Sequence, residues 1–558
     1  MRASSGIAAL LAAVLATGCT SVPVSGPVEY HELDQDPYAQ SVRVAPLPPV
    51  LGASPELVVE GFLNAMSVYQ PSYEVARQYL TAAASADWDP TVGASIYADG
   101  YRPTFTEDAA ILSAPLTGTL DASGVYHPST GQVRHDFQLA RNSNGEWRIA
   151  NPPEGLFISR YLFSTGYTQF DRHYLDLAGQ ALLPDPIWIA PGDNQLQRAL
   201  LTQVKTPSQW LAPLVDPVLG LRIEATDVRA DLVLIELGGS AAELDAAAQN
   251  QVLAEFALAC AQFDACGKIT VSAGGVDWLA EGYPDAEIPI SVFADLAPIH
   301  RVDPPSVFAI SSQYEALVRL APDREVMVVN EQVSQAASLA IAADQVNLAV
   351  VSADREQVEV GRLTQGRLAP ERQGSALLRP VFSRLGELWT AESSVSSFLV
   401  NGVKVDAEGA PKGELTAFAV SPDADRIAVA VKQDTETEAE LWLARVSRSG
   451  GFTLAGWQRV ELAGVDAVRI IDLGWSAPSE LFVLVADHQD ATSVVRATQD
   501  SALISDIGPS NAIDLAELAV APGYQMLARS SSGVLYRFDA DFSWTPWVVG
   551  VAAVTYAG

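Results

Sequence analysis

Phe418-Ala-Val-Ser-Pro-Asp-Ala-Asp-Arg-Ile427 joins two apolar segments through a short polar turn. The same order recurs along the C-terminal half of the chain: an apolar run that ends in a small residue, a polar turn, and a second apolar run. Apolar runs of this length, separated by Pro, Asp and Gly, are typical of paired β-strands joined by tight turns. The other copies lie at residues 339–348, 380–389, 473–481 and 518–526.

The spacing of the copies indicates what they build. Aligned on Ala342, Ser383, Ser421, Ser476 and Ala521, they lie 41, 38, 55 and 45 residues apart. A four-stranded propeller blade takes roughly 40–50 residues. Residues 298–558 are therefore predicted to form an all-β propeller with five visible blades. A sixth would form if residues 306–320 joined the C-terminal strand at 547–556, and a pair of irregular β-sandwiches is the alternative fold.

Upstream of this region, residues 181–297 alternate between helical and strand patterns. A helix is expected after Asp193, because Leu196 and Leu200 lie on one face. A second helix is expected to open at the capping box 240–243, with Ser as N-cap and Glu three residues later. Strands are expected at 221–226, 231–237 and 268–272. This order predicts a small α/β domain.

Residues 51–180 place helices before strands. Ser54 can cap a helix that begins with Pro55, and a second short helix is expected at 73–80. Strands follow, with runs at 133–139 and 145–149 on either side of a hairpin turn that contains Asn and Gly. The segment is therefore predicted to be an α+β cone, with a filled core favoured over a ligand cavity.

The N-terminus carries a targeting signal. Leu15-Ala16-Thr17-Gly18-Cys19 closes an apolar run of about ten residues, which is too short for a membrane span of roughly 20 but suits a secretory signal. The stretch resembles a bacterial lipobox, with Ala16 where Leu is usual. The resemblance implies a signal peptide over 1–18 and lipidation of Cys19 by acyl chains such as palmitate. A plain secretory signal is the alternative.

Residues 19–50 are expected to form a spacer between the lipidated cysteine and the folded body. The segment contains six prolines and has neither helical nor strand periodicity. Proline favours extended backbone, so such a segment acts as a semi-rigid linker.

Charge limits the partners. The chain has 67 acidic against 34 basic residues, a formal net charge of -33. Nucleic acid is excluded as a partner because binding to it depends on neutralising phosphates with Lys and Arg, and anionic lipid would repel the same surface. No second apolar run reaches spanning length, so membrane attachment is expected through the lipid anchor alone.

The remaining cysteines, Cys260 and Cys266, are candidates for a disulfide, as expected in an oxidising compartment. Six residues of continuous helix rise about 9 Å, which exceeds the roughly 7 Å limit between the two Cα atoms of a disulfide. If the bond forms, the helix that carries Cys260 must therefore end near Phe263. Two reduced thiols are the alternative.

Motifs that carry catalysis are missing from the sequence. No metal-binding spacing, nucleophile elbow, phosphate loop or dinucleotide fingerprint occurs, and the many carboxylates are better explained as solvated surface. We therefore expect neither an enzyme nor a bound cofactor or metal. The six histidines are scattered, at His31, His127, His135, His173, His300 and His488.

Three of the predicted domains resemble known modules. Residues 145–155 resemble the last strand and exit of NTF2-like domains. Residues 198–202 and 207–213, with the capped helix, resemble a GerMN domain, which is known from spore germination proteins and actinobacterial lipoproteins. The turn at Ser421 resembles those of TolB-like propeller repeats.

The order of lipobox, spacer, NTF2-like cone, GerMN-like domain and propeller is similar to that of the LpqB family of actinobacterial lipoproteins. The resemblance implies a non-catalytic accessory protein at the extracytoplasmic face of the cell membrane. It also implies binding to the extracytoplasmic domain of a sensor histidine kinase like MtrB, and modulation of MtrAB-type two-component signalling in envelope homeostasis and cell division. The alternatives are a ligand-binding lipoprotein that recognises a cell-wall fragment or other small molecule, and a wall hydrolase.

Overall fold

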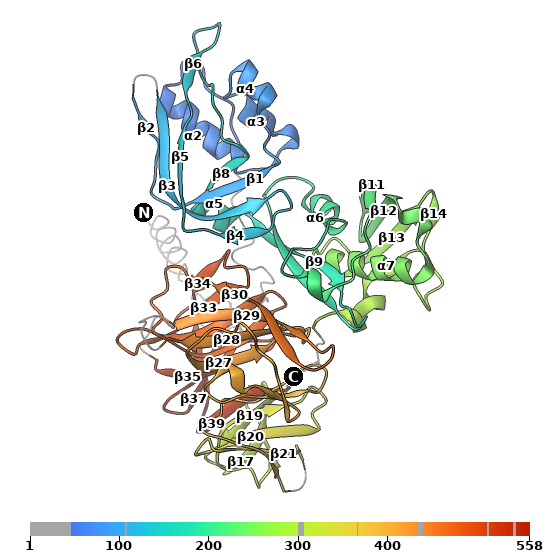
Figure 1. Cartoon of the computed structure of the whole chain (residues 1–558), viewed down its shortest axis with the longest axis vertical. Coiled ribbons are helices and arrows are strands. Elements are labelled where there is room, and N and C mark those ends of the chain that lie inside the picture. Colours follow the sequence, from blue (N-terminus) through green and yellow to red (C-terminus); the bar gives the residue numbers. More distant parts are fainter. Residues whose placement is uncertain are drawn as a thin grey trace, which may run out of the picture. The chain divides into compact units, whose positions relative to one another are not determined.

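The computed structural model describes residues 46–106, 109–299, 306–364, 367–433, 439–509, 513–539 and 543–558. These residues form an α+β domain, a small α/β domain and a β-propeller, which confirms the predicted fold class (Figure 1).

The α+β domain packs short helices against a curved sheet. Ser54 accepts a hydrogen bond from the Leu57 backbone, and Pro55 takes the first helical position, as predicted. The first helix contacts β3, β7 and β8 and buries Phe62 against Trp88. The helices are α2 (Pro55–Met66), η1 (Pro71–Tyr73), α3 (Glu74–Arg77), α4 (Ala82–Asp87) and α5 (Arg160–Gly166). The sheet runs β2 (Thr104–Phe105), β3 (Ala110–Asp121), β1 (Gly93–Tyr97) and β8 (Leu156–Ser159), with β4 (Tyr126–Pro128) and β5 (Gln132–Asp136) also paired to β3.

The predicted hairpin of this domain is shorter than expected. The turn at 142–145 does join two strands, β6 (Leu139–Arg141) and β7 (Trp147–Ile149). The preceding residues, β5, pair with β3 instead. Gln138 has a φ of 45°, a left-handed conformation that a continuous strand does not allow, so the run 133–139 divides between two partners.

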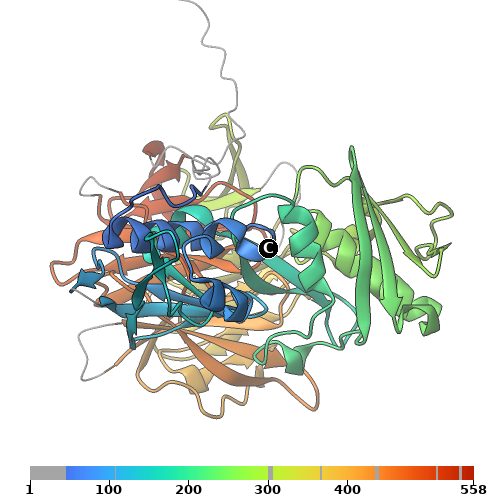
Figure 2. The same ribbon diagram turned by 90° about the horizontal axis from the view of Figure 1, so that it is seen from above.

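A two-stranded antiparallel ribbon, β9 (Thr168–Leu175) and β10 (Leu182–Ile189), follows the α+β domain. The α/β domain then pairs β11 (Leu221–Arg229), β12 (Leu232–Gly239), β13 (Lys268–Ala273) and β14 (Val276–Asp277), with β15 (Ile288–Pro289) also on β13. Its helices α6 (Gln195–Gln203) and α7 (Ala246–Cys260) lie on one side of this sheet (Figures 1 and 2). The short 3-10 helices are η2 (Ala212–Leu214), η3 (Ala241–Glu243) and η4 (Ile290–Leu296).

The start of α7 differs from the prediction. Asp245 is the N-cap, and its carboxylate accepts a hydrogen bond of 2.9 Å from the Ala248 backbone. Ser240 begins only the short turn η3 and its side chain caps no helix, so the capping-box prediction was wrong. Leu244 separates the two elements because its extended backbone ends η3 and leads to the true cap.

The described residues from 306 onward form six four-stranded sheets. We number them as blades. Blade 1 contains β18 (Val326–Asn330), β17 (Ala316–Leu320), β16 (Val307–Ser311) and β39 (Val551–Tyr556); blade 2 contains β19 (Ala336–Ile341), β20 (Asn347–Ser352), β21 (Gln357–Arg362) and β22 (Ala369–Gln373); and blade 3 contains β23 (Val381–Phe382), β24 (Leu388–Thr390), β25 (Leu399–Val400) and β26 (Val403–Lys404), with η5 (Val395–Ser397). Blade 4 contains β27 (Glu414–Val420), β28 (Arg426–Lys432), β29 (Ala439–Ser447) and β30 (Thr453–Val460); blade 5 contains β31 (Arg469–Ala477), β32 (Glu480–Ala486), β33 (Thr492–Thr498) and β34 (Ile504–Asp506); and blade 6 contains β35 (Leu515–Ala519), β36 (Leu527–Ser530), β37 (Val534–Phe538) and β38 (Trp544–Val549).

The blades close into a ring. One edge strand of each sheet contacts the corresponding strand of the next, in the order β39, β19, β23, β27, β31, β35 and back to β39. Blade 1 is completed by the C-terminal strand β39, which pairs with β16. The structure therefore contains the sixth blade that the sequence left open. The alignment positions Ala342, Ser383, Ser421, Ser476 and Ala521 lie at or just past the ends of the other five innermost strands.

We expect ring closure to depend on the buried face of β39. Ala553 is fully buried against Phe308 and Leu339, whereas its neighbour Ala552 is exposed. Ala553→Asp would bury an unpaired carboxylate and should cost at least about 3 kcal/mol of unfolding free energy, measured by denaturant unfolding. Ala552→Asp is the matched control and should change it by about 0.5 kcal/mol or less. Equal losses in the two variants would contradict the closure.

Candidate functional site

The turn between β33 and β34 inserts into the α+β domain. Ala502, at this turn, is fully buried in the hydrophobic core that α2 and the sheet form. Beside it, Asp500 accepts a hydrogen bond of 2.8 Å from the Trp188 indole of β10, and others from the Thr498 hydroxyl and the Ala502 backbone. Burial raises the pKa of Asp500, although these hydrogen bonds oppose the rise. A turn of the propeller thus contributes a residue to the hydrophobic core of the α+β domain.

Three further hydrogen bonds join the propeller to the ribbon and to the segment after α6. The Ser479 hydroxyl donates to Asp171 of β9 at 2.9 Å. Trp210 donates from its indole to the Gly456 carbonyl at 2.6 Å, and its own carbonyl accepts from Arg445 at 2.8 Å. Blades 4 and 5 therefore carry all of these contacts, and we call this region the junction.

At the junction, Arg426 is fully buried and links blade 4 to blade 5. Its guanidinium forms an ion pair with Asp423, donates to the Gln499 side chain, and donates to the Pro478 carbonyl at 2.7 Å. Burial raises the pKa of Asp423, but the charge of Arg426 and the hydrogen bonds to the carboxylate more than offset it, so the net pKa is lowered. Such a pair is stable only while both charges are present.

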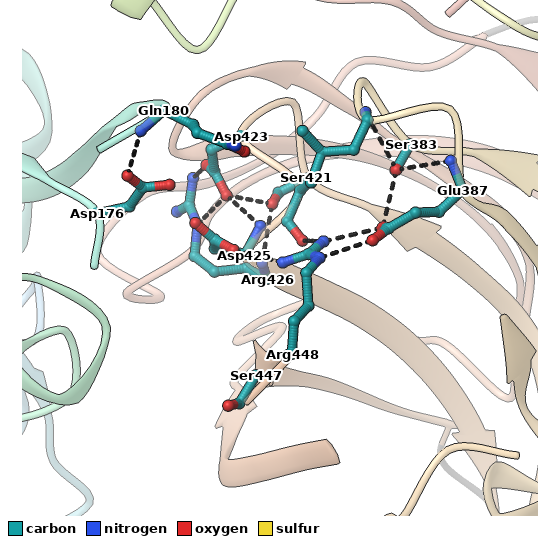
Figure 3. A network of polar contacts seen from close by, with 12 residues as sticks. Asp176, Gln180, Ser383, Glu387, Ser421, Asp423, Asp425, Arg426, Ser447 and Arg448 are labelled. Carbon is teal, nitrogen blue, oxygen red and sulfur yellow. Dashed lines mark hydrogen bonds and ion pairs between the residues drawn. The ribbon is translucent and has the colours of Figure 1, made fainter. Parts of the chain in front are cut away.

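A second arginine links blades 3 and 4 (Figure 3). The Arg448 guanidinium donates to both carboxylate oxygens of Glu387, at 2.7 and 2.9 Å, and to Asp425 at 2.6 Å. The hydroxyl of Ser383 donates to the same Glu387. Burial and the neighbouring charge of Asp423 raise the pKa of Asp425 to about 7 despite the ion pair.

The two clusters share a pattern that the sequence analysis missed. In blades 3, 4 and 5, the serine at the alignment position donates to a carboxylate, which in turn pairs with an arginine. The three sets are Ser383 with Glu387 and Arg448, Ser421 with Asp423 and Arg426, and Ser476 with Glu480 and Arg496. The signal was a serine in the repeat followed by an acidic residue two or four positions later.

The centre of the ring is filled by paired charges. Arg379 binds Asp472 at 2.7 Å and the Leu518 carbonyl at 2.6 Å, and Arg529 binds Glu517 at 2.8 Å. Burial raises the pKa of Glu517 to about 7. The cavity that these residues line measures about 80 Å³, well below the roughly 300 Å³ of a small-ligand pocket. The channel is better explained as structural.

Of the predicted site residues, the structure describes Cys260 and Cys266 and brings them together. Cys19 lies outside the described residues. Cys260 and Cys266 form a disulfide with their Cα atoms 5.7 Å apart, and α7 ends at Cys260, so the chain turns as the bond requires.

The described histidines do not form a site. Burial lowers the pKa of His173 to about 3. Within the described ranges, no group of three or more His, Cys, Asp or Glu side chains is placed to hold a metal ion. His31 and His300 lie outside these ranges.

These observations define a multi-domain propeller protein whose buried charges hold blades and domains together. Residues 48–164 match the family model described as "Lipoprotein LpqB, N-terminal domain", and residues 315–554 match the "Lipoprotein LpqB beta-propeller domain". The chain belongs to the lipoprotein LpqB family.

Relatives match over almost the whole length. The chain is 29% identical to lipoprotein LpqB of Cutibacterium acnes, covering 97% of each chain, and 25% identical to that of Streptomyces avermitilis, covering 98% of this chain and 97% of the relative. TolB from Acinetobacter baumannii is a solved structure with a TM-score of 0.35 and 12% identity, covering 60% of this chain and 99% of that one, and this similarity supports no further conclusion. Within the part of the chain that the structure describes, no helix has the length and apolarity needed to cross a membrane.

Removal of Arg426 should leave a buried, unpaired carboxylate at the junction. Arg426→Met is expected to cost about 3–5 kcal/mol of unfolding free energy, and adding Asp423→Asn should restore a large part of it. Arg469→Met is the control, because its pair with Asp490 is exposed and worth about 1 kcal/mol or less. Denaturant unfolding measures the free energy of unfolding of Arg426→Met, of the double variant and of Arg469→Met. A double variant no more stable than Arg426→Met would contradict the pairing.

Asp425 should make stability depend on pH. Its folded-state pKa is about 7, whereas that of an unfolded Asp is about 3.9. The folded chain therefore binds this proton more tightly, and the contribution of the group to stability falls as the pH rises from about 4 to about 7. The melting temperature of the parent minus that of Asp425→Asn should be smaller at pH 8 than at pH 5. A difference that is constant or grows with pH would contradict the assignment.

Proposed function

We propose that this chain is a lipid-anchored accessory protein at the extracytoplasmic face of the cell membrane, where it binds the extracytoplasmic domain of an MtrB-like sensor histidine kinase. Through this contact it modulates MtrAB-type signalling in envelope homeostasis and cell division. The main support is membership of the lipoprotein LpqB family, since the alignment with the Cutibacterium acnes relative covers 97% of this chain.

The lipobox-like stretch supports the anchor. An acylated Cys19 followed by a proline-rich spacer would hold the body away from the bilayer, and a formal net charge of -33 would repel anionic headgroups. The folded domains would then be free to meet the external domain of another membrane protein.

The state of the buried charges supports a binding rather than a catalytic role. A general acid or base must reach its substrate, but Asp423 at the junction and Glu387 in blade 3 are bound to arginines. The GerMN-like α/β domain adds further surface beside the propeller. Contacts such as the hydrogen bond from Trp188 to Asp500 connect the domains. A partner that contacts two of the domains would meet a pre-arranged surface, which lowers the entropy cost of binding.

The proposal is tested with the chain from Thr20 onward, which keeps every described residue, and the extracytoplasmic domain of the cognate kinase. Calorimetry should show saturable binding with a dissociation constant of about 1 μM or less, a free energy near -8 kcal/mol. The autophosphorylation rate of the full kinase in vesicles should change when the chain is added. The control is the external domain of an unrelated kinase; equal binding to both, or no binding, would contradict the proposal.

The anchor is tested separately. Cys19→Ala removes the thiol that would accept the diacylglyceryl group, so the protein should leave the membrane fraction and lose acyl label. Thr20→Ala, at the adjacent position, should stay in the membrane fraction with its label intact. A Cys19→Ala variant that remains membrane-bound and acyl-labelled would show that the tether lies elsewhere.

A further inference from the structure

A cavity of about 480 Å³ lies at the junction, between blades 4 and 5, the β3–β4 turn, β10 and the segment after α6. Small-ligand pockets occupy roughly 300–1,000 Å³ and favour domain interfaces. It is also much larger than the 80 Å³ space at the centre of the ring. Its size and place suit a ligand of one or two rings.

Two deeply buried side chains present unused hydrogen-bonding atoms here. Asp185 is 3% exposed, and its Oδ2 accepts from Arg172 at 2.5 Å and from the Ser208 backbone at 2.9 Å, but its Oδ1 accepts from none of the described residues. Gln499 is 6% exposed, and its oxygen accepts from Arg426, but its amide nitrogen donates to none of the described residues. Both side chains line the cavity. Because neither atom is itself sealed from solvent, each can bond a ligand or a water in the cavity that its side chain lines.

The charges of the lining disfavour an anion and favour a ligand that donates hydrogen bonds. The lining contains Asp121, Asp185 and Asp500 but neither lysine nor arginine, so an anion would be repelled. Of the three carboxylates, Asp185 is already paired with Arg172, whereas Asp121 accepts from the Ser123 and Val125 backbone and lies 3.4 Å from His127. Asp500 is buried and already accepts from Trp188 and Thr498. The lining therefore suits a neutral molecule rich in hydrogen-bond donors.

The rest of the lining offers flat faces beside adaptable amides. Trp210 lines the cavity, and its indole nitrogen is already engaged with the Gly456 carbonyl, which leaves its ring to contact a ligand. Tyr126 also lines the cavity, but it is 4% exposed and its ring stacks on Phe163. The side-chain amides of Gln209 and Gln458 have no hydrogen bond within the described residues. Aromatic surface combined with carboxylate and amide groups matches a ring that has C–H groups on its faces and hydroxyls at its edge.

We propose that this cavity binds a neutral saccharide of one or two rings, with Trp210 against a ring face and Asp185, Gln458 and Gln499 bound to its hydroxyl or amide groups. The site is independent of the proposed kinase contact. Either can fail while the other holds, because the sugar titration uses the chain alone.

The test is calorimetric titration of the chain from Thr20 onward with chitobiose, cellobiose and maltose. At least one sugar should bind saturably. Trp210→Ala should raise the dissociation constant of that sugar about tenfold, the scale of a lost aromatic contact. The matched control is Trp457→Ala. Trp457 is also partly buried and donates to one carbonyl, that of Glu408, but it does not line the cavity; its loss should leave sugar affinity unchanged.

Gln458→Ala covers the case in which Trp210→Ala unfolds the chain. The Gln458 side chain has no hydrogen-bond partner among the described residues, so its loss should leave the melting temperature unchanged. The dissociation constant of the sugar should rise several-fold. Three outcomes would overturn the proposal: no saturable binding of any of the three sugars, equal weakening by Trp210→Ala and Trp457→Ala, or saturation by spermidine or inorganic phosphate in place of a sugar.

Discussion

The ion pair between Arg426 and Asp423 is the constraint on which the junction depends. The guanidinium has no access to solvent, so all of its hydrogen-bonding capacity must be met inside the protein. The partners come from two blades: Asp423 from blade 4, and Pro478 and Gln499 from blade 5. Gln499 is the first residue of the turn between β33 and β34, which enters the core of the α+β domain. The geometry of one buried charge therefore fixes the angle between two blades and the position of the turn that joins them to another domain.

Arginine–carboxylate pairs that join different blades recur around the ring. Arg448 ties blade 3 to blade 4 through Glu387 and Asp425, and Arg379 reaches across the centre from the start of blade 3 to Asp472 in blade 5 and Leu518 in blade 6. Short blades need such links, because strands of two residues such as β23, β25 and β26 bury little apolar surface of their own. In blades 3, 4 and 5, the serine at the alignment position donates to the carboxylate and helps to orient it, which reduces the entropy lost when the pair forms. Hydrophobic packing closes the ring, and the arginines fix how its blades meet.

The sequence predicted features that local pattern and spacing determine. The blade repeat, the Ser54 cap and the strands β11, β12 and β13 follow from periodicity and from residues adjacent in the chain. Features that depend on tertiary packing were missed. Ser240 and Glu243 match a capping box, yet Asp245 begins the helix, because the extended backbone at Leu244 ends η3 before α7 starts. The junction escaped prediction because Trp188 and Asp500 meet across 312 positions, and neither residue belongs to a recognisable motif.

Blade 1 is assembled from opposite ends of the propeller sequence, since β39 pairs with β16. A polypeptide that emerges from the ribosome or from a translocation pore presents β16 early and β39 last, so every intermediate carries an unprotected hydrogen-bonding edge. Exposed edges of this kind recruit strands from other molecules. The ring cannot close until β39 has paired with β16. Truncation near the last strand would thus leave the entire ring open.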